Sequence, residues 1–257
     1  MFSIDLNCDM GESFGAWTLG SDAELMDYVS SVNVACGFHA GDASVIRKTV
    51  QTAIAKGVAV GAHPSFPDLQ GFGRREMKMS AREVFDIVLY QVAAVKGICE
   101  ALGGKLHHVK PHGALYNQAA KDSDLARAIA EAVKAIDENL ILYGLSNSRL
   151  IAEAERLNLK TASEVFADRT YQADGSLTAR GEPNALIADA DESAAQVLQM
   201  IREKSVTATG GEMVSIKAET VCIHGDGTSA LEFARTINRK LTAAKILIQP
   251  ISSGRVD

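Results

Sequence analysis

Apolar residues along the chain follow two spacings in turn, and this alternation predicts a succession of strands and helices. Residues 2–8 alternate apolar and polar side chains, as a half-buried strand does. Residues 43–56 repeat apolar side chains at helical spacing and end at Gly57, a residue type that often terminates helices. The expected strands are residues 2–8, 32–36, 58–62, 106–109, 140–143, 160–165 and 220–223, and the expected helices are residues 21–29, 43–56, 80–103, 121–138, 146–157, 189–204 and 228–243.

Local signals sharpen several of these expectations. Ser21 with Glu24, and Ser80 with Glu83, have the spacing of a capping box at a helix start. Residues 206–218 are expected to form a hairpin around Gly210-Gly211. The polar segment after the sixth strand lacks helical periodicity and is expected to be an ordered excursion, and residues 246–248 precede a frayed tail.

Strand and helix alternate about seven times, which predicts a parallel sheet with right-handed crossovers. In a doubly wound open sheet, polar groups would gather mainly at one switch point. Here ionisable residues follow nearly every strand: Asp9 and Glu12, His39 and Asp42, His63, Lys110 and His112, Glu164 and Asp168, His224 and Asp226. We therefore favour an α/β fold of the distorted TIM-like (β/α) barrel type with about seven parallel strands. No linker or low-complexity tract interrupts it, so residues 1–257 are expected to form a single domain.

Composition narrows the functional classes. The net charge of −6 and the lack of a basic cluster argue against nucleic-acid binding. Apolar runs stay far below the ~20 residues of a membrane span, and the start of the chain lacks the features of a signal peptide. Four scattered cysteines without a CxxC pair indicate reduced thiols, and we expect a cytoplasmic protein.

The stretch from His107 to Asn117 concentrates the most chemistry. Pro111 ends the strand that contains Val109, because proline has no N–H for the sheet, and Gly113 permits a sharp turn. Around this turn lie a cation, an imidazole, a phenol and an amide, which belong to Lys110, His112, Tyr116 and Asn117. Such loops, positioned by a rigid scaffold, commonly carry function.

Five of the six histidines lie at or just past predicted strand ends: His39, His63, His108, His112 and His224. His107 and His108 point to opposite faces of their strand, and His107 is interpreted as structural. One barrel mouth would bring the others together. Two chemistries could use them, and the residues alone leave both open.

The first chemistry is a hydrolytic metal site with Asp9, His39 and His63 as ligands, although no HExxH motif fixes two ligands locally. The second is metal-free catalysis on a polarised carbonyl. There Lys110 would stabilise the oxyanion, Asp9 would activate water and His112 would carry the proton. A simpler interpretation of Lys110 is an ion pair with Glu164 or Asp168.

Two neighbouring arginines, Arg74 and Arg75, lie within the segment Gly71-Phe72-Gly73-Arg74-Arg75. Guanidinium groups bind carboxylates and phosphates in a bidentate manner, but paired arginines are also common on solvated loops. The segment matches neither a P-loop nor a dinucleotide fingerprint, so we do not expect the chain to bind ATP alone.

Taken together, the motifs resemble those of the LamB/YcsF family, from residue 5 to about residue 250. The matching stretches are Asn7-Cys8-Asp9-Met10-Gly11-Glu12, Asn33-Val34-Ala35-Cys36-Gly37-Phe38-His39-Ala40-Gly41-Asp42, Gly61-Ala62-His63-Pro64-Ser65-Phe66-Pro67-Asp68, Gly71-Phe72-Gly73-Arg74-Arg75, Val109-Lys110-Pro111-His112-Gly113-Ala114-Leu115-Tyr116, Glu164-Val165-Phe166-Ala167-Asp168-Arg169 and His224-Gly225-Asp226.

The resemblance implies a barrel related to the glycoside hydrolase/deacetylase superfamily. It also implies one component of an ATP-dependent 5-oxoprolinase, which opens 5-oxo-L-proline to L-glutamate together with partner subunits B and C. ATP would be a co-substrate bound with or by those partners, and a divalent metal stays open. Catalysis is assigned to Asp9, Lys110 and His112. Substrate binding is assigned to Asn7, His39, His63, Arg74, Arg75, Tyr116, Asp168, Arg169 and His224.

Two rival interpretations remain at this point. One is a stand-alone, metal-dependent amidohydrolase of the deacetylase kind. The other is a non-enzymatic sensor that binds 5-oxoproline for the partner subunits.

Overall fold

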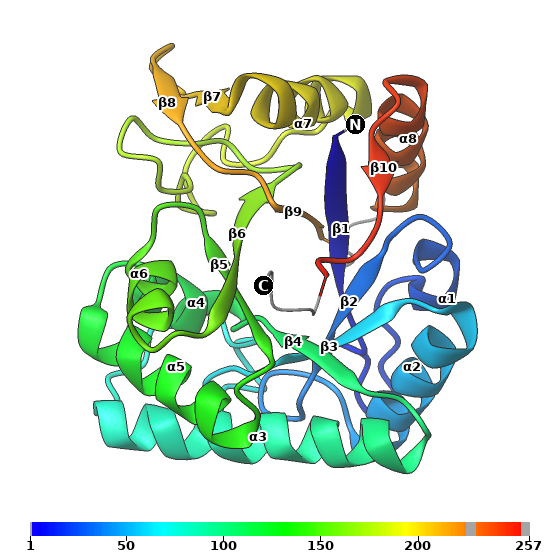
Figure 1. Ribbon diagram of the computed structural model, residues 1–257, viewed down its shortest axis with the longest axis vertical. Coiled ribbons are helices and arrows are strands. Elements are labelled where there is room, and N and C mark those ends of the chain that lie inside the picture. The colour runs from blue at the N-terminus through cyan, green and yellow to red at the C-terminus, as the bar shows by residue number, and fades with distance from the viewer. Residues whose placement is uncertain (1, 225–229, 253–257) are drawn as a thin grey trace.

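The computed structural model describes residues 2–224 and 230–252, and its centre is a closed ring of seven parallel strands. The strands are β1 (Ser3–Met10), β2 (Ser31–Ala35), β3 (Ala59–His63), β4 (Leu106–Val109), β5 (Ile141–Leu145), β6 (Lys160–Phe166) and β9 (Thr220–Ile223). They pair in this order, and β1 also pairs with β9, which closes the barrel (Figure 1). The prediction of a TIM-like barrel with about seven strands is confirmed.

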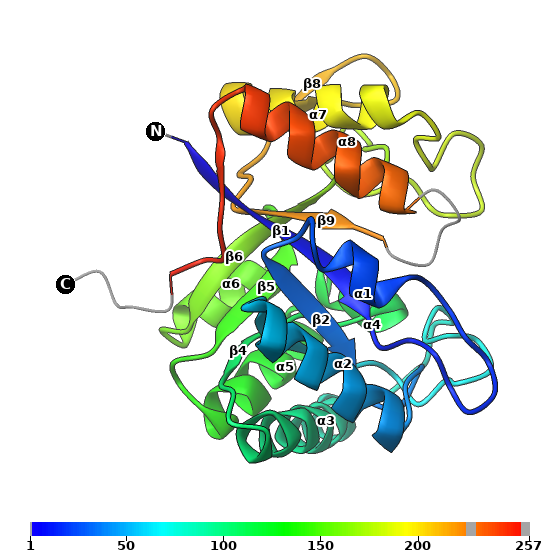
Figure 2. The same ribbon diagram turned by 90° about the vertical axis from the view of Figure 1, so that its right-hand side faces the viewer.

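Helices surround this ring (Figures 1 and 2). The longer ones are α2 (Ala43–Lys56), α3 (Ala81–Ala101), α5 (Ser123–Ile136), α6 (Arg149–Arg156), α7 (Ala190–Glu203) and α8 (Ala230–Ala243). Two predicted helix ends are confirmed. The Ser80–Glu83 capping box forms at the start of α3, and Gly57 ends α2 in the left-handed conformation with φ 69°. Within the described ranges, no helix has the length and apolar content needed to cross a membrane.

In the part of the chain that the structure describes, three short strands lie outside the ring. The expected hairpin is confirmed as β7 (Ser205–Thr207) paired antiparallel with β8 (Met213–Ser215). Beyond α8, β10 (Leu247–Ile248) pairs in parallel with the start of β1, a pairing that the sequence did not predict. The predicted helix 228–243 begins outside the described residues, and α8 is described from Ala230 onward.

Two helix predictions were wrong. The helix expected over residues 21–29 is a single turn, α1 (Asp22–Leu25), and the Ser21 side chain makes no capping hydrogen bond. The Asp22 carboxylate instead accepts a hydrogen bond from the Gly11 N–H. The second error is an omission: α4 (Gly113–Ala119) begins shortly after Pro111 at a glycine with φ 56°. Glycine disfavours helices, and seven residues are too few to show a clear apolar period.

The two faces of the barrel strands differ sharply in polarity. In β1, the apolar side chains of Ile4, Leu6 and Met10 are buried in the large apolar core. The intervening side chains of β1 hydrogen-bond across the barrel interior, as Asp5 does with Tyr143 of β5. Buried polar side chains on the ring strands, or directly after them, include Asp5, Asn7, Asp9, Ser31, Asn33, His63, His108, Lys110, Glu164 and Thr220. The barrel is therefore apolar outside, where helices cover it, and polar inside.

One glycine makes room for this interior. The His108 ring stacks on Tyr143 with ring centroids 4.1 Å apart, and His108 Nε2 lies 2.8 Å from Asn33 Oδ1. A Cβ atom on Gly61 of β3 would lie only 2.2 Å from His108 Nε2. Gly61 is thus required by the packing of His108 on the neighbouring strand. His107 contacts the carbonyl oxygen of Ile251, and its Nδ1 lies 3.0 Å from His108 Nδ1, so its contacts are within the protein, consistent with the structural role predicted for it.

We predict that Gly61→Ala lowers the free energy of unfolding by about 2 kcal/mol or more, because the added methyl group overpacks the interior. Urea denaturation measures this change. Gly97→Ala is the matched control: in α3, its Cβ would meet no atom within 4 Å of the described residues outside the helix backbone. The control is expected to gain about 0.5–1 kcal/mol from helix propensity. Equal stability of the two variants would contradict the packing role of Gly61.

Candidate active site

A cavity of about 390 Å³ opens at the carboxyl ends of the barrel strands. Eight residues that the sequence predicted for the site line it: Asp9, His63, Arg74, Lys110, His112, Tyr116, Arg169 and His224. Asn7, His39, Arg75 and Asp168, which were also predicted, do not line it. The four lie behind or beside the cavity wall, as their contacts below show.

Lys110 lies at the floor of the cavity, directly after β4, and is almost completely buried. Its ammonium nitrogen is 2.9 Å from Asp9 Oδ1 and 2.9 Å from Glu164 Oε1. Asn7 Oδ1 at 3.1 Å and Cys222 Sγ at 3.0 Å complete its surroundings. The ion pair with Glu164, which was the simple interpretation of Lys110, therefore exists, and it exists together with a contact to Asp9 inside the site.

The charges of this cluster stabilise one another. Burial alone would lower the pKa of Lys110, but Asp9, Cys222 and Glu164 outweigh burial and raise that pKa well above its usual value. Burial likewise favours a neutral Asp9, yet His63 and Lys110 outweigh it and hold the pKa of Asp9 well below its usual range. At neutral pH the site therefore contains an ammonium group and an ionised Asp9 in direct contact.

Asn7 and Tyr116 support the cluster from different sides. The Asn7 amide donates to Glu164 Oε1 at 3.0 Å and to Thr220 Oγ1 at 2.7 Å, and its oxygen accepts from Lys110 and Asn33. All these bonds are internal, so Asn7 positions the cluster from behind. The Tyr116 hydroxyl donates to Glu164 Oε2 at 2.7 Å, and Tyr116 also lines the cavity.

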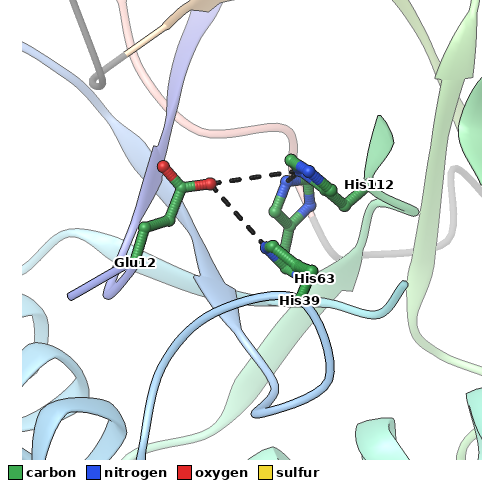
Figure 3. Close-up of side chains that lie close together, drawn as sticks. All are labelled: Glu12, His39, His63 and His112. Carbon is green, nitrogen blue, oxygen red and sulfur yellow. Dashed lines mark hydrogen bonds and ion pairs between the residues drawn. The ribbon is translucent and has the colours of Figure 1, made fainter. Parts of the chain in front are cut away.

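Next to Asp9, three histidines and Glu12 converge from four loops or strand ends (Figure 3). His63 ends β3, His39 follows β2, and His112 precedes α4. The His39 and His112 rings stack with centroids 3.9 Å apart. Burial lowers the pKa of both rings well below the usual value, and neighbouring histidines lower it further, so both are neutral.

The two neighbouring arginines, Arg74 and Arg75, have different surroundings. Arg74 lines the cavity, and its guanidinium lies 4.8 Å from the centroid of the Phe72 ring. Arg75 is instead bound to the Asp68 carboxylate, with Nε 2.9 Å from Oδ1, and does not line the cavity. Of the two arginines assigned to substrate binding, Arg74 therefore lines the cavity, whereas the Arg75 guanidinium is bound to Asp68.

Arg169 secures the excursion after β6. It donates to the backbone carbonyl groups of Thr178 and Ala185, and burial lowers its pKa to about 10. The excursion is ordered as predicted, and Thr178 and Arg180 of that segment line the cavity.

Asp168 and His224 form a pair beside the cavity. His224 Nδ1 lies 2.8 Å from both Asp168 oxygens. Burial alone would raise the pKa of Asp168, but the interaction with His224 outweighs burial and lowers that pKa below its usual value. Asp226, which the sequence also placed after the last ring strand, lies outside the described residues.

Sequence reasoning missed several residues of the site. Glu12 was noted only as a charge after the first strand, yet it faces two histidines. Cys222 and Asn33 contact Lys110 and Asp9, respectively, and were not selected because neither type is distinctive alone. Their positions on the same strand face as other site residues are the signal that could have identified them: Asn33 pairs with Asp9, and Cys222 with Asn7, in neighbouring strands.

Fold and site together define an α/β-barrel protein with an enzyme-like polar cavity at the carboxyl ends of its strands. The LamB/YcsF family matches residues 4–256, and the chain belongs to this family. The chain is 59% identical over 249 residues to a protein of Tolumonas auensis named as the A component of 5-oxoprolinase, covering 97% of this chain and 99% of that protein.

Solved structures agree on the fold. The lactam utilization protein of Thermus thermophilus has a TM-score of 0.92 and 46% identity, over 97% of this chain and 100% of that one. A family 4 carbohydrate esterase of Streptomyces lividans has a TM-score of 0.52 and 11% identity, over 98% of this chain and 94% of that one. At this identity the esterase shows the fold alone.

We predict that Lys110→Met lowers the free energy of unfolding by about 3–5 kcal/mol at neutral pH, because two buried carboxylates lose their cation. Urea denaturation of both proteins measures the change. The matched control is Lys217→Met, which removes an exposed lysine 2.8 Å from Glu219. An exposed pair contributes about 1 kcal/mol or less, so a similar loss in both variants would contradict the buried-charge interpretation.

Proposed function

We propose that this chain is one component of an ATP-dependent 5-oxoprolinase, which opens 5-oxo-L-proline to L-glutamate. The observation that carries the proposal is the nearly full-length similarity to proteins named as the A component of that enzyme. The similarity to a lactam utilization protein supports the same substrate class, a cyclic amide. We place the reaction in the cytoplasm, where ATP is available and where thiols such as the four buried, unpaired cysteines stay reduced.

The chemistry of the substrate explains why partners are needed. A five-membered lactam is a resonance-stabilised amide, and its unassisted hydrolysis at neutral pH is very slow. Phosphorylation of the lactam oxygen activates the ring carbon, and this step requires an ATP site. The sequence contains no P-loop. In our proposal, subunits B and C phosphorylate the lactam, and this chain binds the activated ring and directs water to it.

The residues at the cavity floor suit the second half of this reaction. Asp9 is ionised, faces the cavity and is proposed to activate the attacking water. Lys110 keeps Asp9 ionised and provides positive charge beside the oxyanion that forms. Water adds to the activated carbon and the ring C–N bond breaks, which leaves an acyl phosphate. A second water then hydrolyses this acyl phosphate to glutamate and inorganic phosphate.

His112, the third residue assigned to catalysis, enters the proposal in a modified role. Its Nε2 lies 2.8 Å from the Phe72 carbonyl oxygen, and its Nδ1 lies 2.9 Å from His63 Nε2. Both ring nitrogens are therefore engaged inside the protein. We propose that His112 polarises the group around Asp9 and His63 and does not carry a proton to the substrate by itself.

The charge of the cavity wall suits an anionic substrate. Apart from the lysine at its floor, the described cavity lining contains four cationic side chains and only two acidic ones, Asp9 and Glu76. The four cationic residues are Arg74, Lys121, Arg169 and Arg180. A phosphorylated lactam carries both a carboxylate and a phosphate, which guanidinium groups bind well. Of the two neighbouring arginines, Arg74 is the proposed substrate ligand, because it lines the cavity and Arg75 does not. Tyr116 and His224 complete the proposed binding surface.

The rival interpretation, a stand-alone amidohydrolase of the deacetylase kind, has less support. It rests on a likeness in fold at 11% identity, whereas the named relatives match over nearly the entire chain. A pure sensor is also disfavoured, because binding alone does not require an ionised acid and a lysine in contact at the cavity floor.

We predict that this chain alone, with ATP, forms no glutamate from 5-oxoproline, and that adding its cognate subunits B and C produces ATP-dependent glutamate formation. A coupled glutamate assay, run with and without ATP, measures both conditions. Glutamate formation by the isolated chain without ATP would instead support the stand-alone amidohydrolase. Absence of activity in the complete mixture would refute the proposed reaction.

We predict that Asp9→Asn lowers turnover in the complete enzyme by about 100-fold or more, because the amide cannot accept a proton from water. Asp5→Asn is the matched control, since Asp5 is a buried carboxylate on the same face of β1 at the far end of the barrel interior. It is expected to keep turnover within a few-fold once circular dichroism confirms folding. Equal losses in both variants would remove Asp9 from the catalytic role.

A further inference from the structure

We propose that Glu12, His39, His63 and His112 form a binding site for one divalent transition-metal ion of the zinc class. The four side chains each direct one ligand atom into a common space, and these atoms all lie within 4.8 Å of one another (Figure 3). This inference goes beyond the proposed reaction, because binding of a metal ion can be measured whatever substrate the cavity takes.

Backbone carbonyl groups fix which ring nitrogens carry protons. His63 Nδ1 lies 2.7 Å from the Lys110 carbonyl oxygen, and His112 Nε2 lies 2.8 Å from the Phe72 carbonyl oxygen. A carbonyl oxygen only accepts, so both of these nitrogens donate a proton. Donation of the outer N–H to a backbone carbonyl is also the usual way in which metal-binding histidines are oriented.

The remaining nitrogens of the two rings face each other. His63 Nε2 and His112 Nδ1 are 2.9 Å apart, and in neutral rings both present lone pairs. Two lone pairs at this distance repel unless a cation lies at them. Such a cation is either an additional proton on one ring or a metal ion that binds both.

His39 favours the metal ion. Its ring is fully buried, and neither ring nitrogen has a hydrogen-bond partner among residues 2–224 and 230–252. His39 Nε2 instead faces Glu12 Oε1 at 3.7 Å, too far for a hydrogen bond. A proton shared between His63 and His112 leaves both nitrogens of His39 without a partner, whereas a metal ion binds one nitrogen of each of the three rings. Buried polar groups without partners are rare and often mark a bound water or ion.

The spacing of the ligand atoms also suits a metal ion. Ligands about 2.1 Å from a tetrahedral zinc ion lie about 3.4 Å from one another. Three of the six separations are 2.9 Å (His63 to His112), 3.7 Å (Glu12 to His39) and 4.0 Å (Glu12 to His112), on both sides of that value, and all six are within 4.8 Å. Coordination of an ion would require the more distant of these ligand atoms to move toward the common centre.

The loop after β3 encloses the cluster closely. Gly73 has φ 65°, and a Cβ atom there would lie 2.9 Å from His112 Cδ2 and 2.9 Å from His39 Cβ. A second group of potential ligands, Asp9, Cys222 and His224, lies nearby. That group is less suitable, because the Lys110 ammonium is 2.9 Å from Asp9 Oδ1 and 3.0 Å from Cys222 Sγ and already provides its positive charge.

The ligand set indicates which ions fit. Three neutral imidazole nitrogens with one carboxylate oxygen suit Zn²⁺, Co²⁺ or Ni²⁺, whereas Mg²⁺ and Ca²⁺ prefer oxygen ligands. Of the three metal ligands suggested by the sequence, His39 and His63 belong to this set. Asp9 instead lies beside it, with Oδ2 3.3 Å from His63 Nε2, so the ion would be adjacent to the proposed catalytic acid.

The test is metal binding by the full chain, purified without chelators or a histidine tag. Any bound ion is first removed, and the chain is then titrated with Zn²⁺ or Co²⁺. Elemental analysis of the titrated protein should give one equivalent of metal per chain. Bound Co²⁺ with nitrogen ligands should also absorb visible light. Binding should also raise the melting temperature, because the ion binds the folded state. Both His39→Ala and Glu12→Gln are expected to weaken binding by about 100-fold or more.

His107→Ala is the matched control, because His107 is a partly buried histidine outside the cluster, and it should keep full metal binding. Circular dichroism checks folding; if His39→Ala does not fold, Glu12→Gln decides alone. Failure of the parent chain to bind Zn²⁺, Co²⁺ or Ni²⁺ would overturn the proposal. Binding that survives in both cluster variants would overturn it as well. Neither result depends on whether the chain acts on a lactam.

Discussion

The contact of the Lys110 ammonium with two buried carboxylates is the constraint on which the site depends. Asp9 comes from β1, Glu164 from β6 and Lys110 from the end of β4, so one cation connects three strands across the barrel interior. Buried charges are tolerated only when they are paired and hydrogen-bonded. Any shift in strand register would separate these partners and leave a charge without compensation. The ionised state of Asp9 and the positions of Asn7 and Tyr116 follow from this arrangement.

The outer and inner faces of the barrel strands have different functions: the outer face stabilises the barrel, and the inner face carries the polar side chains. Apolar side chains on the outer face, such as Leu6 and Val34, pack in the core with the helices and stabilise the barrel. Side chains on the inner face hydrogen-bond to one another from Asp5 at one end to Asp9 at the other. The side chains at the cavity end can therefore vary in chemistry without loss of the apolar packing outside.

Much of the fold could be predicted from the sequence because its signals are local, whereas the site was predictable only in part. Alternation in residues 2–8 and the Ser80–Glu83 capping box each act within a few residues, but α4 was missed because it begins at a glycine. Ionisable residues at strand ends identified much of the cavity lining, since closure of a parallel barrel brings those ends together. Which side chains contact each other in the site depends on their directions and on which strands are neighbours. The sequence therefore did not reveal that Glu12 faces His39.

Closure of the barrel by its first and last ring strands has a consequence for synthesis of the protein. Asn7 bonds to Thr220, 213 positions away, and β1 pairs with β9 along four residues. At about 5–20 residues per second, a ribosome needs about 10–40 s to extend the chain from one partner to the other. During that interval the polar side of β1 has no β9 to face. The barrel of the nascent chain therefore cannot close until β9 has been synthesised.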